Sequence, residues 1–274
     1  MERFRQHWMA SNFIQRIYQN GGTLLENEVY ALHYWCWMND VNGLLNNYIA
    51  YYPFVGGGTG STQSITNFSQ NLISSNYLLT PTTGVTGSMC TNFGYQGNAT
   101  TAWWDTGINH STVINLINNG LSFYSRSNII SATNGGYVDI GLSNGSIVQF
   151  SLITGLNPTN KNDSFDSSVN NTGSQIQATT TVTWGYKSGN RIGNTLSLYH
   201  NGGQIATGTG TSDSGINQTI LLGTLIAQIG SIYHQSGRQY AMFGVHQGFT
   251  AAQEALRWQI EQNTQTILGR QINF

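Results

Sequence analysis

Hydrophobic and polar residues alternate most clearly between residues 195 and 209. Leu196, Leu198 and Ile205 lie among polar neighbours with a period of two, which is the pattern of half-buried strands. Between them, the run His-Asn-Gly-Gly at 200–203 offers residues that accept the positive φ angles of a tight turn. This stretch therefore predicts a β-hairpin.

Short strand-like runs recur along most of the chain, and clusters rich in glycine and asparagine separate them. Many short strands at regular spacing with such turns are typical of a β-sandwich or jelly roll. The runs expected as strands are residues 48–54, 77–79, 102–104, 120–126, 137–142, 147–153, 176–184, 196–199, 204–206, 220–225 and 240–245.

The stretch 154–175 interrupts this series and predicts a long polar loop. It holds five asparagines, at positions 157, 160, 162, 170 and 171. Long loops at the end of a sandwich commonly carry binding sites. We therefore expect recognition, if loops provide it, from this stretch or from a loop near residues 105–112.

The first 47 residues show helical spacing instead of strand alternation. Apolar residues recur at this spacing over residues 4–20, and the glycine pair at 21–22 ends the segment. Thr23 and Glu26 have the spacing of a capping box, which predicts a second helix ending near residue 42. The apolar surface of this helical hairpin is too broad for two helices alone. We expect it to pack on the β domain or on another subunit.

A last helix is predicted over residues 251–268. A second capping box at 250–253 begins it, and glycine follows its end. Ala252, Leu256 and Ile260 follow one another at intervals of four and mark its expected apolar face.

These patterns together predict a mainly β protein with two units. The first is an N-terminal helical hairpin over residues 1–47. The second is a jelly-roll β-sandwich domain over residues 48–274 that ends in the amphipathic helix.

Charge is scarce in this chain of 274 residues, since charged residues make up 8% against a usual level of about 25%. The net charge is −1, so we do not expect non-specific binding to nucleic acid. The surface must consist largely of neutral polar residues and glycine. Such surfaces suit proteins that neighbours cover in an assembly, and extracellular proteins that meet sugars.

Neither a membrane span nor an export signal is expected, because no apolar stretch is long enough and the N-terminus lacks a signal-peptide segment. A protein with an extracellular kind of surface and no export signal is released by lysis or assembled inside a cell. A virus particle satisfies both conditions. The expected location is the surface of a virion that is assembled in the host cytoplasm.

Catalytic chemistry is not expected. The aspartates of the β region are widely separated, and every glutamate falls in the helical ends of the chain. Glycosidases need two carboxylates facing each other across a cleft, roughly 5–10 Å apart. The six histidines show no metal-ligand spacing, so neither a metal nor a cofactor is expected. Cys36 and Cys90 are expected to be separate free thiols.

Aromatic residues offer the candidates for binding. Trp104, Trp184 and Tyr186 are candidates for stacking on sugars, although adjacent strand residues point to opposite faces, so Trp103 or Trp104 should lie in the core. Each of these aromatics is more often a core residue than a sugar platform. The candidates for an oligomer or docking interface are Trp8, Trp35 and Trp37.

Several short motifs resemble concanavalin A-like (laminin-G-like) jelly-roll domains, in particular those of tailed-phage virion proteins. They are Tyr-His-Asn-Gly-Gly at 199–203, the strand 240–245, Gly-Phe-Thr at 248–250, the closing run 265–270, Gly-Leu-Leu at 43–45 and the segments 52–57 and 104–109. The resemblance implies a surface-exposed particle component such as a fibre, a capsid decoration or a tail adhesin. It carries over no catalytic residue and no metal ligand.

Three functional hypotheses follow. The leading one is a non-enzymatic virion structural protein that self-associates and docks on other virion proteins of the capsid or tail. The alternative is a carbohydrate-binding adhesin for host surface glycans, which requires exposed aromatics near a polar face. The third and least favoured is a polysaccharide hydrolase or lyase.

Overall fold

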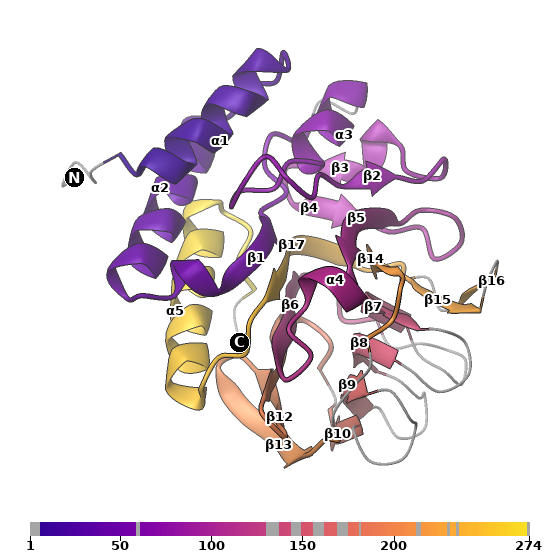
Figure 1. Cartoon of the computed structure of the whole chain (residues 1–274). Helices are drawn as coiled ribbons and strands as arrows, with labels where there is room; N and C mark the ends of the chain where they lie inside the picture. The colour runs from indigo at the N-terminus through magenta and orange to yellow at the C-terminus, as the bar shows by residue number, and fades with distance from the viewer. Residues whose placement is uncertain are drawn as a thin grey trace.

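The chain folds as a two-layer β-sandwich with helices on one side. The computed structural model describes residues 6–58, 61–129, 137–143, 149–155, 162–168, 175–180, 182–211, 215–228, 231–233 and 236–272. Within these residues, two antiparallel sheets enclose a common core, and three helices lie against the outer face of one sheet (Figure 1). The predicted jelly-roll β-sandwich with helices at both ends of the sequence is confirmed.

The sheet that carries the helices is called sheet A. Its described strands run in the order β13-β12-β11-β6-β17-β4-β3, and β1 also pairs with β17. Their bounds are β1 (Tyr48–Tyr52), β3 (Cys90–Thr91), β4 (Gly94–Gln96), β6 (Asn118–Ser125), β11 (Gly185–Ile192), β12 (Thr195–His200), β13 (Gly203–Thr209) and β17 (Gln239–His246).

The opposite layer is called sheet B, and its described strands run in the order β10-β9-β8-β7-β14-β5-β2. Their bounds are β2 (Thr80–Pro81), β5 (Trp104–Asn109), β7 (Tyr137–Ser143), β8 (Gln149–Thr154), β9 (Asn162–Ser168), β10 (Gln175–Thr179) and β14 (Thr219–Leu222). A separate hairpin consists of β15 (Leu225–Gln228) and β16 (Ser231–Tyr233).

Alternation along the strands builds the core between the sheets. In β6, Leu121 and Phe123 belong to this core, whereas Tyr124 packs with the helices. Trp104 and Phe150 enter the same core from sheet B. All five side chains are fully buried. Burying a Leu or Phe side chain contributes roughly 1.5–3 kcal/mol, so these inward positions hold the two layers together.

Strand β9 lies inside the stretch 154–175, so the prediction of a polar loop there is wrong for the strand. Its polar side chains are buried because they find partners in sheet A. The Lys187 ammonium donates to Asp163 at 2.5 Å, and the Ser167 hydroxyl donates to Asn119 at 3.2 Å. Residues 156–161 and 169–174 of the expected loop lie outside the described part of the chain.

The hairpin predicted from residues 195–209 is confirmed as β12 and β13. His200 pairs with Gly203, and the two residues between them have φ angles of +50° (Asn201) and +75° (Gly202). Two successive positive φ angles define the turn type that matches the strand twist. The backbone N–H of Asn201 donates to the Tyr186 carbonyl at 2.9 Å, which fixes the turn against β11.

The expected inward position of Ile205 is wrong. Leu198 pairs with Ala206 and Tyr199 pairs with Gln204, so Ile205 is the extra residue of a bulge. A bulge reverses the alternation beyond it, and Ile205 is 38% exposed, whereas Leu196 and Leu198 are fully buried.

Replacing Gly202 with alanine is expected to lower the free energy of unfolding by more than about 1 kcal/mol. A Cβ atom there would lie 3.0 Å from the Trp258 Cβ and 3.1 Å from the Ala255 Cα, on a backbone with positive φ. Gly203→Ala is the matched control, because its Cβ would meet only the His200 carbonyl at 3.5 Å. Urea unfolding of both variants measures the difference, and equal stabilities would contradict the prediction.

Two N-terminal helices, α1 (Trp8–Gln19) and α2 (Glu26–Val41), pack on the outer face of sheet A. The capping box expected at Thr23 and Glu26 is wrong, because α2 begins at Glu26 and its N-cap residue is Leu25. The Glu28 carboxylate instead accepts the N–H groups of Leu25 and Gly56, each at 2.8 Å. A tertiary contact with Gly56 therefore helps to decide where the helix starts.

Shorter helices fill the connections. They are α3 (Thr62–Phe68), α4 (His110–Val113), η1 (Leu45–Asn47) and η2 (Gly87–Met89). The expectation of a loop near residues 105–112 is therefore wrong, because β5 and α4 occupy this region.

The C-terminal helix α5 (Ala251–Ile267) begins at the predicted capping box, with Thr250 and Gln253 bonded to each other. Its buried face differs from the expected apolar stripe. Ile260 is buried, but Ala252 is exposed, and the other buried positions are Glu254, Arg257, Glu261, Thr264 and Gln265. The reason is that sheet A offers this helix hydroxyl groups as well as apolar side chains.

Helix α5 and the residues after it also bond to β1 and to the segment that follows β1. The Tyr51 hydroxyl donates to Glu261 at 2.8 Å. Just beyond the helix, the Arg270 guanidinium donates to the carbonyls of Phe54 at 2.9 Å and Ala241 at 3.1 Å. Segments more than 200 positions apart are thus joined over sheet A.

Candidate functional site: a neutral groove beside helix α5

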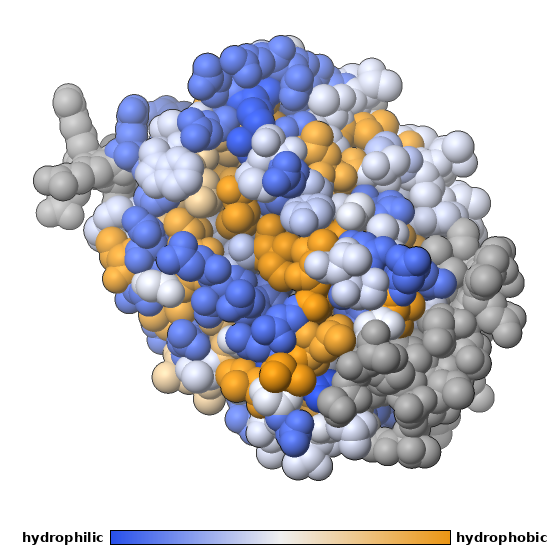
Figure 2. All heavy atoms as spheres, viewed as in Figure 1, coloured by the Kyte–Doolittle hydropathy of each residue, from blue (hydrophilic) through white to orange (hydrophobic). Residues whose placement is uncertain are grey.

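A groove lies on the outer face of sheet A, where strands β11 to β13 meet the start of α5. Its volume is about 310 Å³. The lining consists of amides, hydroxyls and a few apolar groups, from Asn190, Ile192, Thr195, Ser197, Tyr199, Gln204, Phe249, Thr250 and Ala251. Over the face seen in Figure 2, apolar patches alternate with hydrophilic ones.

The floor of the groove is rigid because Asn190 is fully bonded. Its amide nitrogen donates to Glu254 at 2.7 Å and to the Ser188 hydroxyl at 3.1 Å. Its amide oxygen accepts the Phe249 N–H at 2.9 Å. Asn190 and Phe249 are each 1% exposed, so an amide and an aromatic ring together form a preorganised base.

The side of the groove comes from the hairpin. Thr195, Ser197 and Tyr199 alternate with the core residues of β12 and therefore share its outer face. Burial raises the pKa of the Tyr199 hydroxyl, which Ser197 partly offsets by a hydrogen bond. Gln204 is exposed and lies opposite Tyr199 in the register. At neutral pH this wall is therefore uncharged.

Charged groups lie beneath the groove and neutralise one another. Glu254 and Arg257 form a buried ion pair. The Arg257 guanidinium also donates to Tyr48 at 2.9 Å and Ser122 at 3.1 Å, and it stacks 4.0 Å from the centre of the Phe249 ring. Burial alone would lower the pKa of Arg257, but Glu254 and nearby tyrosines raise it. Arg257 therefore remains charged, and its bonds to Glu254, Tyr48 and Ser122 fix the floor.

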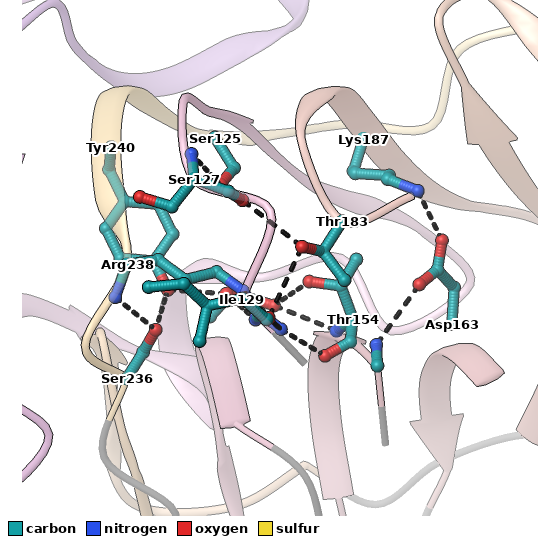
Figure 3. A network of polar contacts seen from close by, with 12 residues as sticks. Ser125, Ser127, Ile129, Thr154, Asp163, Thr183, Lys187, Ser236, Arg238 and Tyr240 are labelled. Atoms are coloured by element: carbon teal, nitrogen blue, oxygen red, sulfur yellow. Dashed lines mark hydrogen bonds and ion pairs between the residues drawn. The ribbon is translucent and has the colours of Figure 1, made fainter. Parts of the chain in front are cut away.

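A second polar cluster lies at one end of the sandwich (Figure 3). Arg238 pairs with Asp139 at 2.6 Å and donates to the Thr154 carbonyl at 2.8 Å. Lys187 pairs with Asp163, and all four charged side chains are buried. Burial lowers the pKa of Lys187 despite its partner. The cluster joins β7, β9 and β11 to the residue just before β17, and its four charged side chains are fully buried.

His200, at the edge of this cluster, is uncharged at neutral pH. Burial, together with the nearby Lys187 charge, lowers the pKa of its imidazole to about 4. Its ring nitrogen lies 3.1 Å from the Trp184 carbonyl. This contact gives the histidine a role in holding the hairpin rather than in proton transfer.

Two of the aromatic candidates for sugar stacking are wrong. Trp104 is fully buried in the inter-sheet core, 5.6 Å from the ring centre of Tyr95. Tyr186 is buried beneath α5 and donates to Glu254 at 3.1 Å. Trp184 is half-buried and stays a prediction.

The docking candidates divide in the same way. Trp35 is buried and stacks on Tyr51 with ring centres 4.0 Å apart, so a role at an interface is wrong for it. Trp8 is 64% exposed and Trp37 is half-buried. Both stay predictions.

Sequence reasoning missed the groove, although part of it was detectable. The outward positions Thr195, Ser197 and Tyr199 follow from the same alternation that predicts the hairpin. No local signal indicates that Phe249 and Thr250 pack beside them. That contact depends on the path of the chain from β17 into α5.

The part of the chain that the structure describes contains neither a metal-binding cluster nor a membrane-spanning helix. Within the described residues, no group of three histidine, cysteine or acidic side chains is arranged to hold a metal ion. None of the described helices has the length and apolar character needed to cross a membrane.

Comparisons with known proteins define the class of fold. No family model matches the chain, and no curated protein matches it in sequence. Domain 4 of AbnA, an extracellular GH43 arabinanase from Geobacillus stearothermophilus solved with arabinotriose, matches with a TM-score of 0.50. The identity is 12% over 77% of this chain and 98% of that domain.

Two further structures are matched over only part of their own length. A structure of botulinum neurotoxin type C, whose cell entry depends upon two ganglioside molecules, matches with a TM-score of 0.51. Its identity is 13% over 80% of this chain and 52% of that chain. A NanB sialidase from Streptococcus pneumoniae gives 13% identity and a TM-score of 0.40, and this chain spans 23% of the sialidase chain. At these identities the comparisons with the arabinanase domain and the neurotoxin show a β-sandwich fold and no more.

Proposed function

We propose that this chain is a non-catalytic carbohydrate-binding β-sandwich and that the groove beside α5 holds the sugar. The observation that carries the proposal is the lining, which is neutral, rich in amides and hydroxyls, and set over the ring of Phe249. The volume of about 310 Å³ is at the lower end of the usual range for ligand pockets, roughly 300–1,000 Å³.

The chemistry of the lining matches that of a sugar. Sugar hydroxyls both donate and accept hydrogen bonds, as do the hydroxyls of Thr195 and Ser197 and the amide of Gln204. The apolar face of a sugar ring can lie on Ile192 or over the edge of Phe249. The bonded floor reduces the entropy that binding would otherwise cost.

Two proteins of the same fold support this function. One is the arabinanase domain solved with arabinotriose, and the other is the toxin whose cell entry depends on gangliosides. Of the hypotheses drawn from the sequence, the glycan-binding adhesin is thus better supported than the virion structural protein. The phage family, the location on a virion, the virion partners and self-association stay predictions.

The distribution of acids supports the non-catalytic part of the proposal. Of the aspartates described in the sandwich, Asp139, Asp163 and Asp166 are buried and Asp105 is half-buried. Glu254 and Glu261 lie on the buried face of α5. A glycosidase would need two carboxylates that face a cleft, and the described residues of the groove supply none.

Filling the groove is expected to abolish sugar binding. Thr195 is exposed and tolerates a large strand-forming residue, so Thr195→Trp should lower affinity by at least roughly tenfold. Gln204→Ala should weaken binding by about 0.5–1.5 kcal/mol through the loss of one hydrogen bond. A glycan array followed by calorimetry on the strongest sugar measures both effects.

Gln177→Ala is the matched control for Gln204→Ala. Gln177 is equally exposed, but it lies on β10 of the opposite sheet. Failure of the unmodified chain to bind any glycan would overturn the proposed function. Binding that survives Thr195→Trp unchanged would place the sugar elsewhere.

A further inference from the structure

We infer that the groove selects uncharged sugars and rejects sugars that carry a carboxylate, such as uronic and sialic acids. The inference rests on the proposed function and names the class of glycan that the same site takes.

No charged side chain is present among the described residues that line the groove. The guanidinium of Arg191, a neighbour of two lining residues, donates to the carbonyls of Gly193, Ser167 and Thr211. A second cation, Arg257, lies behind the Phe249 ring. Its three donor nitrogens are directed to Glu254, Tyr48 and Ser122. An acidic sugar would therefore find no guanidinium free to pair with it.

The carboxylate of Glu254, which is already paired with Arg257, occupies a donor of the floor. It lies directly beneath Asn190, whose amide nitrogen it holds at 2.7 Å. The amide hydrogens of Asn190 are thus both used, one by Glu254 and one by Ser188. The floor has no donor left for a second carboxylate.

The N-terminus of α5 is a local feature that favours an anion, because helix N-termini attract negative charge. Two features counteract it. The capping box already occupies the N–H of Gln253 through Thr250. Glu254 then places a negative charge in the first turn of the helix. A sugar carboxylate would meet a helix end whose charge is already matched.

Desolvation decides the balance. A carboxylate that leaves water and gains no partner is strongly disfavoured, whereas a neutral hydroxyl exchanges water for the hydroxyls and amides of the wall at little cost. A neutral sugar is therefore expected to bind at least about tenfold more tightly than the corresponding sugar that carries a carboxylate.

Matched pairs of sugars test the inference. Gluco- and galacto-oligosaccharides, with and without oxidation of C6 to the carboxylate, differ only in charge at one carbon. Calorimetry at low salt should show binding of the neutral members and at least about tenfold weaker binding of the acids. Ser197→Lys places a cation in the middle of the wall and should restore binding of the acids. Ser197→Gln is the neutral control of similar length and should not.

The outcomes separate the two proposals. If neither member of any pair binds and the glycan array is also blank, the proposed function fails. If both members bind equally tightly, the function stands and the charge selection is overturned. If the acids stay excluded in Ser197→Lys while the neutral sugars still bind, the groove is not the source of the selection, and the inference is overturned too.

Discussion

Replacing Glu254 with alanine is expected to lower the free energy of unfolding by about 3–5 kcal/mol. Glu254 is fully buried and bonds to Arg257, Ser188, Asn190 and Tyr186. Its removal leaves the Arg257 charge buried without its carboxylate partner. Because Asn190 also loses a partner, sugar binding should weaken in the same variant. Urea denaturation measures the stability, and calorimetry measures the affinity.

Glu26→Ala is the matched control for this experiment. Glu26 also lies in the first turn of a helix, but it is exposed. Its removal should change stability by less than about 1 kcal/mol. A Glu254→Ala variant as stable as Glu26→Ala would show that the buried pair does not hold α5 to sheet A.

Replacing Asp166 with asparagine is expected to stabilise the protein above neutral pH. Burial raises the pKa of the Asp166 carboxyl to about 7, and a hydrogen bond from Gln175 offsets only part of this rise. In the unfolded chain the same group titrates near 3.9. Between about pH 4 and pH 7, the folded state keeps a proton that the unfolded state releases, so stability falls as pH rises.

Asparagine keeps the shape and still accepts the Gln175 bond at 3.0 Å, but it carries no charge. At pH 8 the variant should be more stable by about 3–4 kcal/mol, the equivalent of a shift of about three pKa units. At pH 4 the two proteins should have similar stability, and this comparison is the internal control. Thermal unfolding from pH 4 to pH 8 measures the effect. A difference that does not change with pH would contradict the prediction.

The parts of the fold that were predictable are those where one local pattern suffices. The hairpin follows from its turn residues and from Leu196 and Leu198. The start of α5 follows from Thr250 and Gln253. In each case the determining contacts lie within a few residues of one another, so the sequence window contains the cause.

The errors arise where tertiary partners override local pattern. β9 reads as a loop because Asp163 and Ser167 are polar, yet Lys187 and Asn119 satisfy them inside the sandwich. Ile205 fits the alternation of apolar and polar residues in the sequence, but a bulge turns its side chain outward.

The buried face of α5 could not be predicted for a related reason. Arg257 is normally a surface residue, and only Glu254, Tyr48 and Ser122 together make its burial favourable. The candidate site shares this limit. Its neutral character was visible in the composition, whereas its position depends on where α5 meets β12.

The contacts between α5 and the first strand also constrain how the protein can be made. During synthesis, sheet A can form its strands before the ribosome reaches residue 251, but the outer face around Tyr51 then lacks Glu261 and Arg270. Loops that close over such long separations form slowly. A nascent chain therefore exposes surface that is buried in the folded protein until α5 emerges, and this interval is when it is most prone to aggregation.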